Sequence, residues 1–372
     1  MPGIYIHIPF CKQACHYCNF HFSTSLQQKD ELIKALINEI MLSERNREPI
    51  ETLYFGGGTP SILTIDDLQL IFDALHKRFE FANDIEITLE ANPDDITPEK
   101  LKLWKTIGIN RFSIGIQSFL NKELVWMNRA HTAEESLQCI DKVQEAGFDN
   151  FSVDLIYGSP ILNDDDWKRN VDMVIEKNIP HISCYALTVE PKTALDKLIA
   201  QHKAASVDSE KQAQQFLLLM DWMQRAGYEH YEISNYAKPG KRSKHNSSYW
   251  QSKQYYGFGP SAHSFDGKSR RWNIANNALY IQSLQNNTLN FEEEILTETQ
   301  MLNEYIMTSL RTMEGLRLDV VSNRFGKDKS WKLEVGSKKW QDSCKIKVVD
   351  NALLLTREGK LFADGIAADL FF

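Results

Sequence analysis

Three cysteines stand within eight residues in the segment Cys11-Lys-Gln-Ala-Cys15-His-Tyr-Cys18. Thiolates at this spacing can fold around one soft metal centre, and a 4Fe-4S cubane held by three cysteines keeps one iron without a protein ligand. Such an iron has an open position for a small ligand, as a catalytic metal does. On spacing alone, the alternatives are a zinc loop or a structural cluster with its fourth ligand from elsewhere in the chain.

The other cysteines, at positions 139, 184 and 344, are far apart in the sequence. Scattered thiols in a chain without an export signal do not indicate a disulfide framework. We expect Cys139, Cys184 and Cys344 to be small buried or incidental thiols. The metal or redox chemistry is therefore predicted at the N-terminal group alone.

Polar and glycine residues follow several of the predicted strands. The run 56–60 reads Gly-Gly-Gly-Thr-Pro, Glu90 lies in LEANP, Gln117 in IGIQSF and Asp154 in VDLIYG, with Arg129 just downstream in MNRAH. Glycine lets a backbone approach a ligand closely, although a run of glycines is also typical of a bare tight turn. A single carboxylate at a strand end would usually be a helix N-cap. Their repetition across successive units instead predicts one site where the strand ends converge.

The elements that position these residues alternate between strands and helices up to about residue 226. This alternation predicts repeated βα units around a parallel sheet, either a partial (β/α)6 barrel or a doubly wound sheet. The predicted strands are 4–8, 52–57, 86–91, 111–116, 151–157 and 182–188, and the predicted helices are 29–45, 66–79, 98–107, 133–146, 165–178 and 208–226.

Two further segments follow this 1–226 unit. Residues 227–292 are rich in Tyr, Asn, Ser, Gly and basic residues without a sustained period, so we expect irregular structure that lines or wraps something. Residues 293–372 begin with a helical pattern, continue with two short helices and a hairpin at 345–356, and end in a last helix. They predict a small, winged-helix-like α+β domain.

Composition narrows the class of protein. The 372 residues are 42% hydrophobic and 25% charged, as in ordinary globular proteins, and the net charge of −8 gives no basic field for nucleic acid. The N-terminal sequence MPGIYIHIPFC lacks the pattern of a signal peptide, and the longest apolar runs are far shorter than a membrane span. We expect a cytoplasmic protein with no nucleic-acid partner.

The cysteine loop and the glycine run resemble the radical S-adenosylmethionine superfamily, whose members carry CxxxCxxC after the first strand of a barrel. Five further segments, IYIHIPFC, YFGGGTPS, SIGIQSF, NRAH and DLIYGSP, are similar to one branch of it. That branch contains the oxygen-independent coproporphyrinogen III oxidase family and the related HemW-like haem chaperones. The similarity extends over essentially the whole chain.

The resemblance implies which residues hold the cofactors. The cluster would be bound by Cys11, Cys15 and Cys18. S-adenosylmethionine on the open iron would be contacted by Tyr5, Tyr17, Gly57, Gly58, Thr59, Glu90, Gln117, Arg129 and Asp154, with Tyr17 facing the adenine. No catalytic residue is assigned.

Two functions remain open within this branch: oxidative decarboxylation of a porphyrinogen, and carriage of haem to an acceptor protein. The oxidases carry a further cysteine two residues after the third ligand, where this chain has Phe20. They also carry an N-terminal extension over the active site, whereas here the first strand begins almost at residue 1, so we expect an open mouth. Both features favour the haem chaperone, with the oxidase as the alternative.

Residues 245–250, His-Asn-Ser-Ser-Tyr-Trp, match the HNxxYW motif of the haem-chaperone branch. Histidine is a common axial ligand of haem iron and aromatic rings can stack on a porphyrin, so His245 is the expected haem contact. Nearby Lys238, Lys241, Arg242 and Lys244 could meet propionates. Without the resemblance, these residues would be a hydrogen-bonded loop and a solvated basic surface. For His263, in GFGPSAHSF, we expect packing against the barrel mouth.

The resulting prediction is a haem chaperone with a 4Fe-4S cluster, S-adenosylmethionine and haem as cofactors. Its partners would be haem and an acceptor protein that the sequence does not identify. Peripheral membrane association and a homodimer are both compatible with the sequence.

Overall fold

The computed structural model describes residues 2–44 and 48–372. Six parallel strands form the centre of the main sheet and occur in it in chain order, β1 to β6. They are β1 Gly3–Ile8, β2 Ile50–Gly57, β3 Phe81–Ala91, β4 Arg111–Gln117, β5 Phe151–Tyr157 and β6 His181–Ala186. A doubly wound sheet would reverse its strand order at a switch point. The sequential order found here is that of a partial barrel, so the predicted α/β fold is confirmed.

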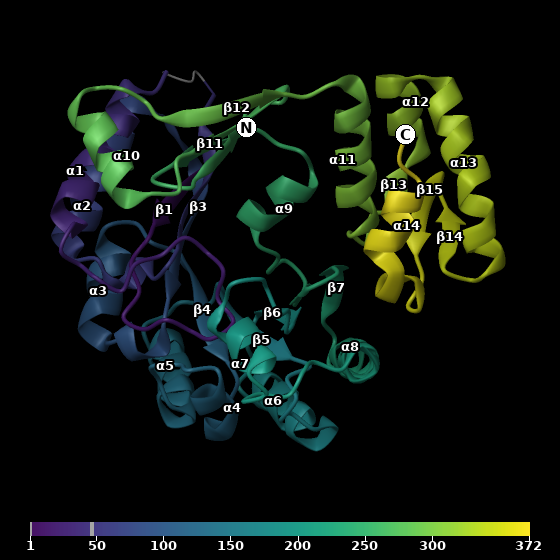
Figure 1. The fold of residues 1–372 in the computed structure, drawn as a ribbon, viewed down its shortest axis with the longest axis horizontal. Helices are drawn as coiled ribbons and strands as arrows, with labels where there is room; N and C mark the ends of the chain where they lie inside the picture. The colour runs from purple at the N-terminus through teal and green to yellow at the C-terminus, as the bar shows by residue number, and fades with distance from the viewer. Residues whose placement is uncertain (1, 45–47) are drawn as a thin grey trace.

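Helices cover the outer side of this sheet in an arc (Figure 1). They are α1 Lys29–Leu42, α2 Ile65–Arg78, α3 Pro98–Thr106, α5 Ala133–Glu145, α6 Asp164–Glu176 and α8 Ser209–Arg225. Several begin where the sequence supplies a cap: Thr64 and Thr132 each form a capping box with the third helical residue. Residue 45, the predicted end of the first helix, lies outside the described residues. The sequence did not indicate the short helices α4 Asn121–Trp126 and α7 Ala194–Ala200.

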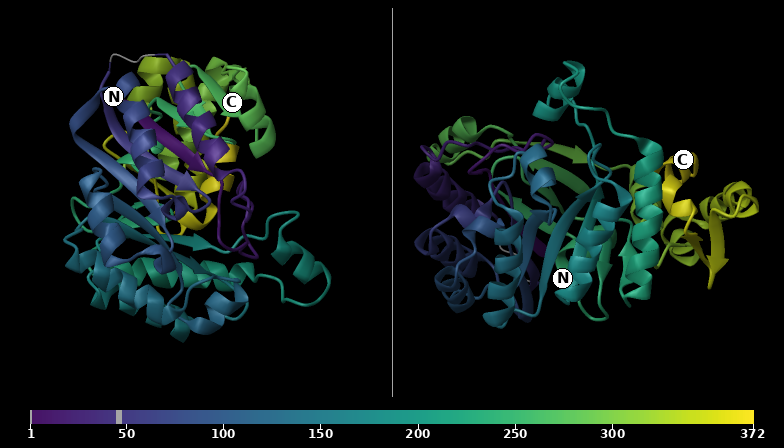
Figure 2. Two further views of the ribbon diagram at one scale, coloured as in Figure 1. Left: turned by 90° about the vertical axis from the view of Figure 1, so that its left-hand side faces the viewer. Right: turned by 90° about the horizontal axis from the view of Figure 1, so that it is seen from below.

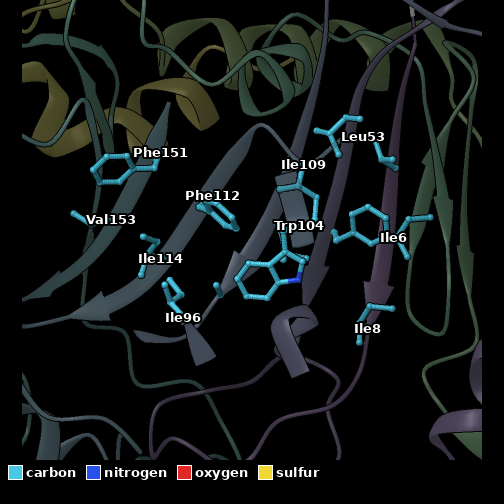
Figure 3. Close-up of a cluster of buried hydrophobic side chains, with 14 of the residues drawn as sticks. Ile6, Ile8, Leu53, Ile96, Trp104, Ile109, Phe112, Ile114, Phe151 and Val153 are labelled. Carbon is cyan, nitrogen blue, oxygen red and sulfur yellow. The ribbon is translucent and has the colours of Figure 1, made fainter. Parts of the chain in front are cut away.

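The core lies between the sheet and these helices. Ile4, Ile6 and Ile8 of β1 are fully buried in it, and Figure 3 shows Ile6 and Ile8 among aromatic side chains that include Trp104 of α3. Successive strand residues point to opposite faces. Tyr5 and His7 therefore face the inside of the barrel.

The segment 227–292 is more regular than predicted. It contains β7 Glu229–Glu232, β8 Asn235–Ala237, α9 Lys244–Trp250, β9 Tyr255–Phe258, β10 His263–Phe265, β11 Ser269–Asn273 and α10 Asn277–Gln285. A further strand, β12 Phe291–Ile295, begins in this segment and ends just beyond it. β9 pairs in parallel with β1, and β10, β11 and β12 follow as antiparallel neighbours. The expectation of irregular structure was wrong because strands of three to five residues are too short to show a period.

The last part of the chain has a hydrophobic core of its own. Its elements are α11 Glu298–Leu310, β13 Leu316–Arg317, α12 Leu318–Phe325, α13 Lys327–Asp342, β14 Ile346–Val349, β15 Ala352–Leu355 and α14 Ala363–Asp369. The three strands form an antiparallel sheet in the order β13-β15-β14. Figure 2 shows this unit beside the barrel. The predicted small α+β unit with a hairpin is confirmed.

Within the described residues, no helix combines the length and the apolar composition needed to cross a membrane.

Candidate functional site

The cysteine loop follows the C-terminal end of β1 and is held by the loop after α4. Gln13 donates to the backbone carbonyl and to the side-chain oxygen of Asn128, at 3.0 and 2.9 Å, and Asn128 donates to the carbonyl of Ala14 at 2.7 Å. The backbone N–H of His16 donates to the carbonyl of Met127 at 3.1 Å. Asn128 has a φ of 58°, a left-handed conformation that asparagine tolerates. The segment that includes NRAH therefore fixes the shape of the cysteine loop.

The three thiols are half-buried and uncrosslinked. Thr59 Oγ1 lies 3.6 Å from Cys11 Sγ, and Arg129 Nη1 lies 3.2 Å from Cys15 Sγ. Burial raises the pKa of Cys11, and it raises the pKa of Cys18 to about 11. A thiol must lose its proton to bind a metal. The positive charge of the iron ions would therefore lower the pKa values of these cysteines again.

Among residues 2–44 and 48–372, no group of three His, Cys, Asp or Glu side chains is arranged to hold a single metal ion. A cubane spreads its ligands over several irons, so its thiolates stand farther apart than those of a one-ion site. The donor set, three soft thiols on one loop, fits a cluster. Of the remaining cysteines, Cys139 and Cys184 are buried and Cys344 is exposed on the C-terminal unit.

Gly56 provides the floor for the first group of site residues. A Cβ there would lie 2.9 Å from the ring of Tyr5, 2.9 Å from the ring of Tyr54 and 3.1 Å from Glu90 Oε1. Tyr54 donates to Glu90 Oε1 at 2.7 Å, and the backbone N–H of Gly57 donates to Glu90 Oε2 at 3.2 Å. Burial raises the pKa of Glu90 to about 8. A buried carboxyl of this kind is suited to accept a cationic ligand such as an ammonium group.

The glycine run crosses the chain that leads into the cysteine loop. A Cβ at Gly58 would lie 2.6 Å from the carbonyl oxygen of Phe10, and Gly57 has a φ of 110° with the ring of His7 directly over it. Side chains at either position would displace backbone or force a strained conformation. The glycines are therefore needed for the close packing of the glycine run against the chain around His7 and Phe10.

A second group gathers over Gly115. A Cβ there would lie 3.1 Å from Gln117 Nε2, 3.3 Å from Arg129 Nη2 and 3.5 Å from Asn92 Oδ1. Arg129 Nη2 donates to Asn92 Oδ1 at 2.8 Å and to the carbonyl of Gly115 at 2.7 Å, whereas its buried Nε has no partner among the described residues. A guanidinium with an unused buried donor is suited to a carboxylate. The carboxylate of a bound amino acid would satisfy it.

Asp154 of β5 lies between these two groups. Its carboxylate is hydrogen-bonded to the hydroxyls of Ser183 and Ser113, and burial raises its pKa to about 6. Asp154 also interacts electrostatically with Glu90 and with Arg129. Tyr17, from the cysteine loop, packs with Met127 and Ile156 on the same side. The structure thus brings the predicted cofactor residues of five strands and three loops into one connected site.

Two members of this network were not predicted. Tyr54 stands two residues before the glycine run, and Asn92 stands two residues after Glu90; Asn92 Nδ2 also donates to Thr59 Oγ1 at 3.2 Å. Both lie in motifs that the sequence analysis quoted. The alternation of a strand from Tyr54 to Gly56, on one face, was the signal that could have identified Tyr54.

The HNxxYW motif forms helix α9 and does not face the cofactor groups directly. His245 is 1% exposed. Its Nδ1 lies 2.8 Å from Thr52 Oγ1, its Nε2 lies 2.9 Å from the Tyr249 hydroxyl, and its ring stacks on Tyr54 at 4.9 Å. Burial, together with Arg111, lowers the pKa of His245 to about 3. In this structure both ring nitrogens are occupied.

The nearby cations predicted to meet propionates are each engaged in an ion pair or a hydrogen bond. Lys241 pairs with Asp149, Arg242 pairs with Glu229 and Glu314, Lys244 pairs with Asp84, and Lys238 contacts the side chain of Asn178. This basic cluster therefore has protein partners in the described chain.

Comparison with known proteins identifies the family to which this chain belongs. A family model described as the radical SAM superfamily matches residues 5–174. The protein named heme chaperone HemW from Bacillus subtilis (strain 168) is 32% identical over 372 residues, which cover 98% of each chain. The chain belongs to the HemW family of the radical SAM superfamily.

A second HemW relative, from Mycobacterium tuberculosis (strain ATCC 25618 / H37Rv), is 34% identical over 85% of this chain and 83% of its own length. The structure of coproporphyrinogen III oxidase HemN from Escherichia coli is similar at a TM-score of 0.85 and 21% identity, covering 100% of this chain and 90% of that one. HemN therefore shares the fold with this HemW family member. Fold alone does not assign a reaction.

Membership of the radical SAM superfamily implies a 4Fe-4S cluster and S-adenosylmethionine, and the cluster, when bound, can supply an electron to the sulfonium of that cofactor. The residues of this HemW family member fit both groups. The thiols would hold the cluster, Glu90 and the Gly57 backbone would bind the ammonium end of the methionine portion, and Arg129 would meet its carboxylate. Tyr17 of the cysteine loop interacts with Cys15, Cys18 and Arg129.

Proposed function

We propose that this chain is a cytoplasmic haem chaperone that binds haem and transfers it to an acceptor protein, while carrying a 4Fe-4S cluster and S-adenosylmethionine. The observation that carries this proposal is Phe20. Its side chain is 68% exposed two residues after the third cysteine, at the position where the oxidases of the branch carry a further cysteine. A phenyl ring can neither exchange a proton nor bind a metal, so the oxidase chemistry lacks a group here. The names of the HemW relatives support the same function.

His245, the haem contact expected from the sequence, is proposed as an iron ligand of a rearranged state. Its Nε2 can take iron only after the Tyr249 hydroxyl, 2.9 Å away, has been displaced. The exchange would also disturb the stack between His245 and Tyr54. His245→Ala should then change the absorption spectrum of bound haem while leaving the cluster intact, because the cysteines and α9 belong to different segments of the chain.

The deciding experiment is anaerobic reconstitution of the cluster followed by parallel assays. We expect a Soret band on titration with haem, transfer of that haem to an apo-globin, and no conversion of coproporphyrinogen III in the presence of reductant and S-adenosylmethionine. Phe20→Cys is a matched variant, since it restores the missing thiol at an exposed position without changing the core. Multiple-turnover decarboxylation by the unaltered protein, without haem binding, would replace the chaperone with the oxidase.

A further inference from the structure

The antiparallel strands β9, β10 and β11 place one histidine, one arginine and three aromatic residues on a single sheet face. The register pairs His263 with Trp272, and it pairs Phe265 with both Arg270 and Tyr255. Residues directly opposite each other in antiparallel strands project to the same face, as do residues two apart on one strand. The side chains of these five residues therefore form one surface, the β9–β11 face.

The opposite face of the same strands is already covered. Asn273 of β11 donates to Glu39 of α1 at 2.6 Å, and Tyr280 of α10 donates to the same carboxylate at 2.6 Å. That side belongs to the outer helix layer. The β9–β11 face consequently looks toward the inside of the barrel, where His263 lies close enough to His7 to affect its pKa.

His263 is an exposed residue on this inner face. Its ring lies over Trp272, with 6.1 Å between ring centres and 27° between ring planes. In the part of the chain that the structure describes, its ring nitrogens have no hydrogen-bond partner, whereas both ring nitrogens of His7 and of His245 do. Partial burial and the neighbouring Arg270 lower its pKa, which keeps the imidazole neutral and able to bind a metal.

The aromatic neighbours and the cation suit a flat, dianionic ligand. Tyr255, Phe265 and Trp272 are half-buried, so each leaves ring surface open for stacking. Arg270 pairs with Glu304 of α11 at 2.7 Å, and its remaining donors could meet a carboxylate. A cavity of about 300 Å³ adjoins the face at Phe265, and its other lining residues, among them Met301 and Tyr305 of α11, lie outside the face.

We propose that haem first binds on the β9–β11 face, before the rearrangement that would free His245, with His263 as the iron ligand, the three aromatic rings against the porphyrin and Arg270 at a propionate. This inference rests on the proposed haem-chaperone function and names its primary binding site. It replaces the expectation that His263 only packs against the barrel mouth. Haem at this position would lie on the same side of the sheet as the cofactor residues Tyr5 and Glu90, so both ligands would share the interior of the barrel.

The test is haem titration of the cluster-containing protein, followed by the Soret band. His263→Ala should lose the band or weaken haem binding at least tenfold, and added imidazole should restore the spectrum of the unaltered protein to His263→Gly, because free imidazole can fill the vacated position. Trp272→Ala should weaken binding roughly tenfold, the value of one lost aromatic contact. His202→Asn, at an exposed histidine remote from the β9–β11 face, is the matched control and should bind haem normally.

The two proposals fail in different ways. Absence of haem binding by the unaltered protein would refute the chaperone function itself. Normal haem binding with an unchanged spectrum in His263→Ala would leave that function standing and refute the site. Cluster content and circular dichroism of each variant identify any that fail to fold, and His263→Gln, which keeps the polarity and approximate size of the side chain, should still lose the imidazole spectrum.

Discussion

At the scale of single residues, the affinity of the cofactor site for a cation depends on two carboxyl groups. Burial keeps both of them partly protonated. Glu90 has a pKa of about 8 and Asp154 a pKa of about 6. Each group is held by hydroxyl or N–H donors from neighbouring strands, so its position is fixed before any ligand arrives. A cationic ligand would favour the ionised form of both. The cost of ionising them is therefore part of the binding equilibrium.

The affinity for S-adenosylmethionine should rise with pH between about 6 and 8, because its ammonium group requires the ionised Glu90 and the free protein loses that proton only near pH 8. The ligand-free protein should show the opposite trend in stability. The native state keeps the Glu90 proton to a higher pH than the unfolded chain does, so the free energy of unfolding should fall across the same interval. Equilibrium dialysis and urea denaturation measure the two trends, and Glu90→Gln should flatten both. Equal slopes in Glu90→Gln would assign them to other groups.

The cluster should depend on each of the three loop cysteines. Cys15→Ala should abolish the broad absorption of the reconstituted cluster, because two thiolates cannot hold a cubane that needs three. Cys344→Ala, at an exposed cysteine of the C-terminal unit, is the control and should retain normal iron and sulfide. Retention of full iron and sulfide content by Cys15→Ala would contradict the assignment.

At the scale of elements, β2 connects the cofactor site with the motif helix α9. Tyr54 of this strand donates to Glu90 on one side and stacks on His245 on the other. Thr52, two residues earlier on the same face, lies within hydrogen-bond distance of Nδ1 of the same imidazole. A displacement of His245 would therefore affect the position of Glu90, because the ring of Tyr54 contacts both residues.

Tyr54→Phe should weaken S-adenosylmethionine binding about ten- to a hundredfold, since a hydrogen bond to a charged group contributes about 1.5 to 3 kcal/mol. The phenyl ring still fills the space against His245, so cluster content and fold should not change. Tyr228→Phe is the matched control: its buried hydroxyl donates to the carbonyl of Ile179, away from the site. Isothermal titration of the two variants compares them, and equal affinities would mean that the Tyr54 hydroxyl does not support Glu90.

The sequence allowed prediction of the elements whose hydrophobic pattern extends over many residues. It also allowed prediction of site residues that lie close together in the chain. β5 was predicted residue for residue at 151–157, and the cysteine loop was readable because its ligands lie within eight residues. Tyr54 and Asn92 were not predicted, because their roles depend on side chains that belong to other strands. The surroundings of His245 and His263 escaped for a related reason: the strands around them are too short to show alternation, and only pairing with β1 decides which face is inside.

At the scale of the whole molecule, the C-terminal unit is joined to the barrel by ionic and polar contacts. Glu232, 1% exposed on β7, pairs with Arg311 at 3.1 Å. Lys360 Nζ lies 2.8 Å from His230 Nδ1, and burial lowers the pKa of Lys360 to about 8. The backbones of the two units are also hydrogen-bonded, because the N–H of Ile233 donates to the carbonyl of Arg311 at 3.0 Å. The two units therefore depend on each other for the satisfaction of buried charge.

Arg311→Ala should lower the free energy of unfolding by about 3 kcal/mol, because it leaves the Glu232 carboxylate buried without its cation. Arg357→Ala removes another ion pair between the two units, with Asp221, but both of these groups are well exposed. That control should cost less than about 1 kcal/mol. Urea denaturation followed by tryptophan fluorescence measures both, and similar losses in the two variants would show that burial of Glu232 does not matter.

The position of β1 between β2 and β9 has a consequence for biogenesis. β9 is synthesised about 250 residues after β1, which at ribosomal rates of roughly 5 to 20 residues per second is a delay of roughly 10 to 50 seconds. During that delay one edge of β1 has no partner, and the cysteine loop at its end stands beside an unclosed sheet. Assembly machinery would have access to the three thiols from this side while the chain is still growing. The order of translation itself thus provides an interval for cluster insertion before β9 pairs with β1.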